Sequence, residues 1–271
     1  MAEFRADAAV VGAGPAGLIA GLALAEIGLD VTVIGPPADP RDGRTAALFQ
    51  ASVQLLKRLG VWQELASFAA PLDAIRLVDA TGGLMRAPEV LFRASEIGEE
   101  AFGYNVPNAA ITTGLERLAA SRLKRVAAAV SEIRIAPHGV TLIGDDTSWQ
   151  VALVAAADGR QSACRAAAGI TSRHWQYDQG AIVCTLQHTR PHHGVSTEFH
   201  RRVGPLTVVP GPGMTCNLVW VDRVSECERL KGLDDRAFAS ELEQHLLGLL
   251  GRVTVTTPRR VFPLSGQTAE P

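Results

Sequence analysis

The chain has 271 residues, of which 47% are hydrophobic and 20% are charged. A chain of this length and apolar content can bury one large core or two ordinary ones, so we expect a folded globular protein. Lys and Arg number 26 against 28 Asp and Glu, a formal net charge of −2. This balance provides no basic field for nucleic acid or anionic lipid, and nucleic acid is excluded as an expected partner.

The N-terminal segment carries acids at Glu3 and Asp7, and its apolar run is too short for a secretory signal. No stretch approaches the length of a membrane span. The four cysteines show no CxxC spacing, which favours reduced thiols. We therefore expect a cytoplasmic protein, with a peripheral membrane association as the open alternative.

The first three predicted elements form a βαβ unit. Residues 8–11 are a short apolar run that ends at a glycine, residues 16–27 have the pattern of a helix, and residues 31–34 are β-branched. The loop between the first strand and the helix reads Gly12-Ala13-Gly14-Pro15-Ala16-Gly17. In such a loop the first glycine permits a tight turn, the second lets the backbone approach a pyrophosphate, and the third lets helix and strand pack closely. The unit predicts a dinucleotide-binding site at the helix N-terminus.

One expected side chain is missing from this unit. A carboxylate usually follows the second strand and binds the ribose hydroxyls, but Gly35 stands there. Asp39 and Asp42 are the nearest substitutes. Either they reach the adenosine ribose, or the protein lacks that contact and Arg44 serves the phosphate or adenine side.

Further elements follow in chain order. We predict helices over residues 46–59, ended by Gly60, and over about 108–126. Residues 128–155 change to a period of two and predict a three-stranded meander. Strands are expected at 181–186, 206–209 and 216–221. A last helix is capped by Asp234 or Asp235 and ends at Gly251; its apolar face comprises Phe238, Leu242, Leu246, Leu249 and Leu250.

A second motif follows the third strand of the meander. Asp158, Gly159, Ser162 and Arg165 occupy the positions of the Asp-Gly motif of flavoprotein aromatic hydroxylases. Alone, this segment reads as an Asp-Gly turn that caps a helix at Ser162. Its coincidence with the glycine loop favours the functional interpretation.

Other segments extend this likeness over the whole chain. Residues 43–48, 59–62 and 103–108, and then 177–179, 196–199 and 204–206, resemble corresponding segments of the ubiquinone-biosynthesis hydroxylases. The chain thus resembles the para-hydroxybenzoate-hydroxylase-like flavoprotein monooxygenases. The resemblance implies an α/β fold, in which a Rossmann-like FAD-binding domain carries an inserted β-meander and is joined to an α+β substrate domain.

The resemblance also implies a reaction. FAD would be reduced by NAD(P)H and would then use O2 to hydroxylate the phenolic ring of a quinone precursor. That precursor would carry a polyprenyl chain in one version of the reaction and none in the other. By motif position the cofactor-binding residues would be Gly12, Gly14, Pro15, Ala16, Gly17, Arg44, Thr45, Asp158 and Gly159. No catalytic side chain can be assigned and no metal site is expected. A peripheral membrane or multi-enzyme association fits such a substrate.

The resemblance predicts a division of the chain. Residues 1–172 would form the first part of the FAD-binding domain, with segment 70–105 on the substrate side. Residues 173–262 would form the substrate domain, and 263–271 would return to the FAD domain. The family's third motif, Gly-Asp followed by small residues, His and Pro, is not found before Pro271, so we expect a truncated chain. A halogenase or reductase of the same fold, or a non-catalytic flavin-binding fragment, is the rival interpretation.

Three other features of the sequence each allow two interpretations. The first is a group of three histidines, His188, His192 and His193. An exposed polar turn is favoured over a metal site there, because Pro191 breaks any helical spacing. Residues 211–213 lack the helix and lysine of a phosphate loop and predict a hairpin turn. Trp175 and Tyr177 line a substrate pocket or pack at a domain junction.

Overall fold

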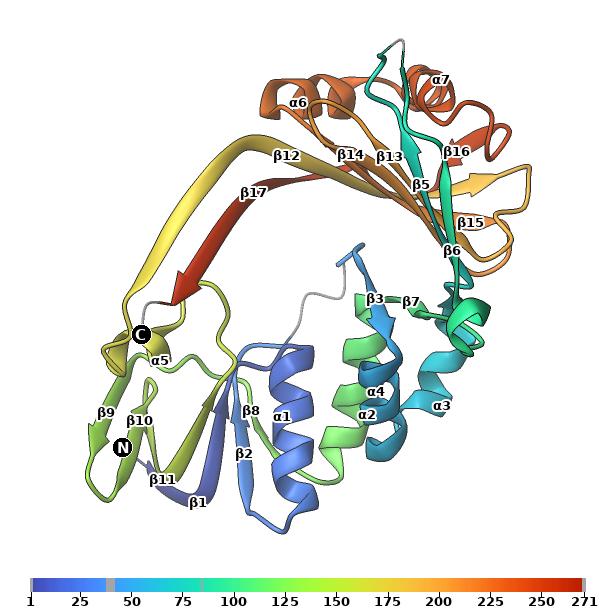
Figure 1. Cartoon of the computed structure of the whole chain (residues 1–271). Coiled ribbons are helices and arrows are strands. Elements are labelled where there is room, and N and C mark those ends of the chain that lie inside the picture. The colour runs from blue at the N-terminus through green and yellow to red at the C-terminus, as the bar shows by residue number, and fades with distance from the viewer. Residues whose placement is uncertain (1, 38–41, 84, 270–271) are drawn as a thin grey trace.

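Three β-sheets organise the chain (Figure 1). The structure is a computed structural model that describes residues 2–37, 42–83 and 85–269. A six-stranded sheet is built from the N-terminal half, an eight-stranded sheet mainly from the C-terminal half, and a three-stranded sheet lies between them.

The six-stranded sheet contains the predicted βαβ unit. Its order is β8 (Lys124–Val126), β2 (Val31–Ile34), β1 (Ala2–Val11), β11 (Thr147–Ala156), β10 (Gly139–Ile143) and β9 (Glu132–Ala136). Strand β1 is parallel to both β2 and β11. Strands β9, β10 and β11 form the antiparallel meander that the sequence predicts.

Helices α1 (Pro15–Glu26) and α4 (Asn108–Ala120) contact one another beside this sheet. Helix α1 packs closely because Gly21 has no side chain: a Cβ there would lie 2.8 Å from Cγ2 of Val33. Leu18 and Leu22 are buried against Val10 of β1. Helices α2 (Gln50–Leu59) and α3 (Trp62–Leu65) extend this core, and the 3-10 turn η1 (Ala66–Phe68) follows α3.

The small sheet has the order β3 (Thr45–Phe49), β7 (Gly103–Pro107) and β4 (Ala70–Pro71). It links the two larger sheets. The Asn105 side chain of β7 donates hydrogen bonds to the Pro210 carbonyl, at 2.8 Å, and to Oδ1 of Asn217, at 2.9 Å.

The eight-stranded sheet combines strands from distant parts of the chain. Its order is β16 (Val253–Val255), β12 (Ser172–His188), β15 (Thr215–Asp222), β14 (Pro205–Pro210), β13 (Val195–His200), β5 (Ala74–Asp79) and β6 (Val90–Arg93), and β17 (Arg260–Ala269) also pairs with β12. Strand β5 is parallel to β13, and the 3-10 turn η2 (Ala94–Ile97) follows β6.

Helices α6 (Val224–Gly232) and α7 (Asp235–His245) cover one face of this sheet (Figure 1). Trp220, Phe238 and Leu242 lie in the core between sheet and helices. Helix α7 begins at the predicted cap, because the Asp234 side chain accepts a hydrogen bond from the Ala237 N–H at 2.8 Å. The opposite face of the sheet is turned toward the six-stranded sheet (Figure 1).

A two-stranded ribbon joins the two large sheets. Strands β12 and β17 leave the eight-stranded sheet together and curve toward α5 (Ala163–Ala167) beside the six-stranded sheet (Figure 1). Their register shifts between Gln176 and Gly180, where the ribbon enters the sheet.

The structure corrects three predicted helix ends. The helix predicted over 46–59 begins only at Gln50, because Thr45–Phe49 pairs with β7. The helix predicted over 108–126 ends at Ala120, and Lys124–Val126 instead pairs in parallel with β2. The last helix ends at His245, not at Gly251. In each case helical spacing of apolar residues continues past the point where other structure takes over.

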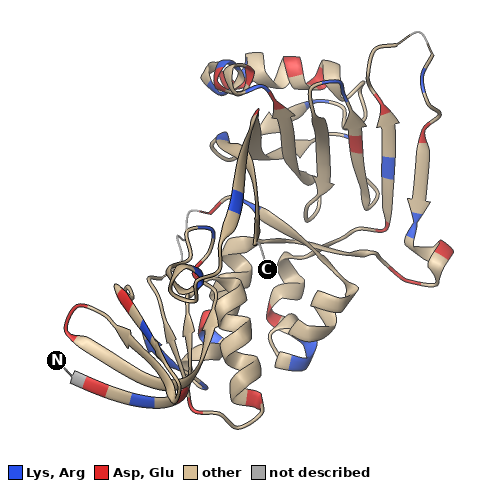
Figure 2. Ribbon diagram, turned by 60° about the vertical axis from the view of Figure 1, so that its left-hand side comes forward, with Lys and Arg blue, Asp and Glu red and all other residues tan. Residues whose placement is uncertain are grey.

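Charged residues of both signs are interspersed along the whole chain in the view of Figure 2. None of the helices in the described ranges is long and apolar enough to cross a membrane.

Candidate functional site

The glycine loop connects β1 to α1, and two of its glycines are required by the protein itself. Gly12 has a φ of +111°, and a Cβ there would lie 2.1 Å from the Ala157 carbonyl oxygen. A Cβ on Gly17 would lie 1.9 Å from the carbonyl oxygen of Gly12. Both distances are far below van der Waals contact, so the strand, the loop and the helix can pack this closely only with glycine at these positions.

Gly14 differs from both. It is the N-cap residue of α1 with a φ of −72°, and a Cβ there would meet no atom within 4 Å. Neither backbone strain nor packing therefore demands glycine at this position. The open space lies at the N-terminus of a 12-residue helix, where backbone N–H groups favour an anion. This is the geometry that the fingerprint assigns to a pyrophosphate.

A cavity of about 410 Å³ opens at this point. Its walls come from four places in the sequence: the loop and first residue of α1, the segment before β3, the start of α4, and β17. The residues that line it are Gly14, Pro15, Asp42, Arg44, Asn108, Ala109, Thr112, Arg260 and Phe262.

Arg44 is held in this cavity by Asp42. Its Nε and Nη2 each donate to the carboxylate at 2.8 Å, and Asn108 Nδ2 donates to the same group at 3.1 Å. The guanidinium also lies 5.3 Å from the ring centre of Phe262, a cation–π distance. Against the effect of burial, the hydrogen bonds from Arg44 lower the pKa of Asp42 from 3.8 to about 2. Asp42 is therefore an ionised clamp on Arg44.

The missing acid after β2 has a steric cause. A Cβ at Gly35 would lie 2.7 Å from the backbone nitrogen of Ala13 in the glycine loop, so this position has no room for a side chain. Of the two substitutes, Asp42 binds Arg44, and Asp39 lies outside the described residues.

The Asp-Gly motif lies against the glycine loop. The Asp158 backbone nitrogen would be 2.9 Å from a Cβ on Gly12, so the structure brings the two motifs together. The Asp158 carboxylate accepts hydrogen bonds from Ser162 Oγ at 2.6 Å and from the Cys164 N–H at 3.1 Å. Burial opposes its ionisation, but these hydrogen bonds keep the pKa of Asp158 below its ordinary value. The turn does cap α5 from Ser162, whose side chain accepts from the Arg165 N–H.

A second cavity, of about 790 Å³, lies between this motif and the ribbon. Asp158, Arg160, Trp175, Tyr177 and Gln267 are among the residues that line it. Trp175 Nε1 donates to the Tyr177 hydroxyl at 2.7 Å. The two aromatic side chains thus line a cavity between the Asp-Gly motif and the ribbon.

The other predicted site residues are not among those that line the first cavity, but each is a sequence neighbour of a residue that lines one of the first two cavities. Ala16 is exposed in the first turn of α1, and Thr45 begins β3 directly after Arg44. Gly159 has a φ of +82°, as a turn requires. Sequence reasoning did not assign a role to Asn108, Arg260 or Phe262. Asn108 had a signal in its position after Pro107 at a helix start, whereas the two β17 residues had none.

The turn at residues 211–213 and the three histidines do not line either of these two cavities. Residues 211–213 form the predicted turn between β14 and β15. The prediction of an exposed histidine turn is wrong for His188, which is 4% exposed and packs edge-on against His192. Within the described ranges, no group of His, Cys, Asp and Glu residues could hold a metal ion. All four cysteines are free and buried.

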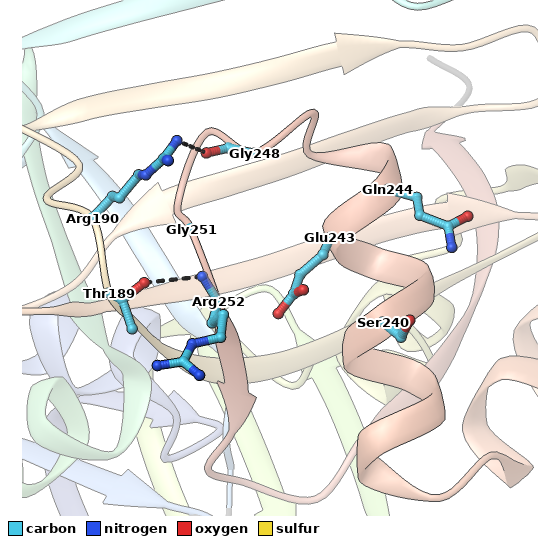
Figure 3. Close-up of a pocket in the computed structure, with 8 residues that line it drawn as sticks. All are labelled: Thr189, Arg190, Ser240, Glu243, Gln244, Gly248, Gly251 and Arg252. Atoms are coloured by element: carbon cyan, nitrogen blue, oxygen red, sulfur yellow. Dashed lines mark hydrogen bonds between the residues drawn. The ribbon is translucent and has the colours of Figure 1, made fainter.

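A third cavity lies between α7 and β16 (Figure 3). It has a volume of about 520 Å³ and is lined by polar side chains, among them Arg190, Glu243 and Arg252. Arg190 Nη1 donates to the Gly248 carbonyl at 2.9 Å, and the Arg252 N–H donates to Thr189 Oγ1. None of the predicted site residues lines it.

The fold and this geometry define a two-part dinucleotide-binding protein, in which a strand of the second part lines the candidate cofactor cavity. The sequence model described as FAD binding domain matches residues 5–259. The chain belongs to this family, whose cofactor is FAD. The glycine loop, the open space over Gly14 and the adjoining cavity fit that dinucleotide.

Relatives and solved structures agree with this assignment. The chain is 36% identical to ubiquinone hydroxylase UbiL of Rhodospirillum rubrum over 99% of its length, which is 64% of that protein. It is 28% identical to 3-demethoxyubiquinol 3-hydroxylase of Escherichia coli over 97% of this chain and 69% of that one. The p-nitrophenol 4-monooxygenase PnpA of Pseudomonas putida superposes with a TM-score of 0.75 at 17% identity, covering 99% of this chain and 70% of that chain. The predicted fold, a Rossmann-like FAD domain of the para-hydroxybenzoate hydroxylase type with a meander and a substrate part, is confirmed.

Proposed function

We propose that the protein is an FAD-dependent monooxygenase that uses NAD(P)H and O2 to hydroxylate a phenolic ring, in particular a polyprenylated quinone precursor. The observation that best supports this proposal is the cavity at Gly14, which is lined by the glycine loop and by β17 of the eight-stranded sheet. The ubiquinone hydroxylase names of the relatives support the substrate class. The chain spans 64% of the length of the UbiL relative.

In this proposal Gly12, Gly14, Pro15, Ala16 and Gly17 hold the FAD pyrophosphate through backbone groups. Arg44 and Thr45 border the cofactor, and the Asp158-Gly159 turn fixes the loop from behind. When bound, FAD supplies the oxygen chemistry, and the protein binds, orients and shields the reactants.

The open sheet face and the ribbon bring the substrate to this site. Trp175 and Tyr177 offer aromatic surface in the second cavity, next to Asp158. A polyprenyl chain on the substrate would bring the protein to a membrane surface, so we infer a cytoplasmic protein with peripheral membrane association. The division at residues 172 and 262 also belongs to this proposal.

The test follows the oxygen atom. Purified chain is incubated with FAD, NADH or NADPH, a demethoxylated quinol with a short prenyl chain, and ¹⁸O₂. We expect a product heavier by one ¹⁸O atom, with one NAD(P)H oxidised and one water formed per turnover. NAD(P)H oxidation without labelled product for a panel of such phenols would contradict the proposal. Gly14→Val serves as the matched inactive control.

A further inference from the structure

Strand β17 contributes two side chains to the cofactor cavity. Arg260 and Phe262 line it together with Gly14 and Pro15, more than 240 residues away in sequence. Strand alternation explains how they reach it. Val261, between them, packs against the core under α6 and α7, so its two neighbours face the opposite side, toward the glycine loop.

The two arginines of the cavity differ in charge balance. Arg44 has committed Nε and Nη2 to Asp42, so this pair together carries no net charge. Within the described ranges, Arg260 has no carboxylate within 4.0 Å of its guanidinium nitrogens and makes no side-chain hydrogen bond. Among the described residues that line this cavity, Arg260 is therefore the uncompensated cation, and the cavity already opens onto the N-terminus of α1. Both features favour a bound anion at the same place.

Phe262 ties this arginine to the rest of the site. Its ring lies under the Arg44 guanidinium at 5.3 Å, which fixes β17 against the segment before β3. The strand that carries Arg260 is thus held at the cavity by a contact independent of any ligand.

We propose that Arg260 is a pyrophosphate-binding residue. It lies on β17 of the eight-stranded sheet and would contact the FAD phosphates from the side opposite the glycine loop. Arg44, in contrast, borders the cofactor as a neutralised pair with Asp42. The inference rests on the FAD site of the proposed function but not on hydroxylation. A failed hydroxylation assay would leave it standing, and a failed binding test would not decide the substrate.

The test compares ligands with and without phosphates. Dissociation constants for FAD, ADP and riboflavin are measured by fluorescence and calorimetry for the wild type, Arg260→Ala, Arg260→Lys and Arg252→Ala. Arg252 is the matched control, because it is an exposed arginine in the third cavity, away from the predicted site residues (Figure 3). Circular dichroism verifies folding of each variant.

We expect Arg260→Ala to weaken FAD and ADP by about tenfold or more, the effect of losing a charge-assisted hydrogen bond. Riboflavin should change by less than about twofold, because it lacks phosphates. Arg260→Lys should fall between, since it keeps the charge but loses the planar fork. Arg252→Ala should match the wild type.

Three results would overturn the proposal. One is unchanged FAD and ADP affinity in Arg260→Ala, another is an equal loss for riboflavin, and the third is a wild type that binds neither FAD nor ADP. If Arg260→Ala does not fold, the charge-removing variant Arg260→Gln is used: wild-type ADP affinity should fall with added NaCl more steeply than that of Arg260→Gln, and equal slopes would overturn the proposal.

Discussion

At the residue scale, the three loop glycines serve different partners. Gly12 and Gly17 are required by the protein, because their hypothetical Cβ atoms would lie 2.1 Å and 1.9 Å from carbonyl oxygens. Gly14 is free of such contacts. A fingerprint read from sequence cannot separate these surroundings, whereas the structure leaves open space at the second glycine, as the proposed pyrophosphate site requires.

This assignment predicts the behaviour of Gly14→Val. The variant should fold with a melting temperature within a few degrees of the wild type, since no protein atom lies within 4 Å of the new Cβ. FAD binding should be lost, because the side chain would fill the place of the pyrophosphate. Gly232→Val is a matched control with equal free space outside the cavity. Unchanged FAD affinity in a folded Gly14→Val protein would refute the placement of the cofactor.

The Asp42 clamp makes a prediction about pH. Its pKa is lowered to about 2 from 3.8, so the stabilisation from the ionised clamp is complete above the ordinary pKa and is lost as pH falls through about 2. Asp42 therefore gives no pH dependence to FAD binding between pH 5 and 9. Because the carboxylate is committed to Arg44 and not to the ribose, Asp42→Asn should not weaken FAD binding by more than about threefold, and the Arg44 charge that it uncovers should favour the bound anion. A tenfold loss would instead identify Asp42 as the ribose ligand.

Sequence reasoning found the loop and the Asp-Gly motif because both are local. Residues 12–17 carry their spacing within one turn, and Asp158 lies directly after a strand. Arg260 could not be found in this way, since its place in the cavity depends on β17 crossing from one sheet to the other. The empty position at Gly35 was visible in the sequence, but its cause, the contact with Ala13, was not.

At the element scale, the close packing of the β12–β17 ribbon at Trp175 requires a glycine on the opposite strand. Trp175 and Gly266 are paired across the ribbon, and a Cβ on Gly266 would lie 2.1 Å from the indole ring. Gly266→Ala should therefore lower the free energy of unfolding by about 1–3 kcal/mol, the effect of overpacking. Urea denaturation measures this change, with Gly232→Ala as the control at a position with open space. Equal stability of the two variants would show that the indole moves freely aside.

Element boundaries show where local pattern loses to pairing. The apolar spacing that predicted a helix over 46–59 includes Leu48, yet Thr45–Phe49 is extended because β7 offers hydrogen bonds along its whole length. Lys124–Val126 likewise becomes a strand at the edge of β2. Strand β13 and helix α6 were missed. Their apolar periodicity is weak because polar residues such as Glu198 and Lys231 interrupt it. Both elements are stabilised by packing in the core around Trp220.

At the scale of the whole molecule, two sheets are joined twice. Strands β5 and β6 enter the eight-stranded sheet from the middle of the N-terminal half, and the ribbon returns from that sheet to α5. The cofactor cavity lies where both parts contribute walls. FAD binding should therefore stabilise the junction as well as the loop, as expected for any ligand that binds only the folded state.

The central claim is the position of the dinucleotide. A crystal structure of the chain grown with FAD tests it most directly. We predict density for the pyrophosphate over Gly14 at the start of α1, with the Arg260 guanidinium in contact and the Asp42–Arg44 pair intact. Ordered FAD at any other place, or a pyrophosphate at Gly14 with Arg260 turned away, would contradict the account.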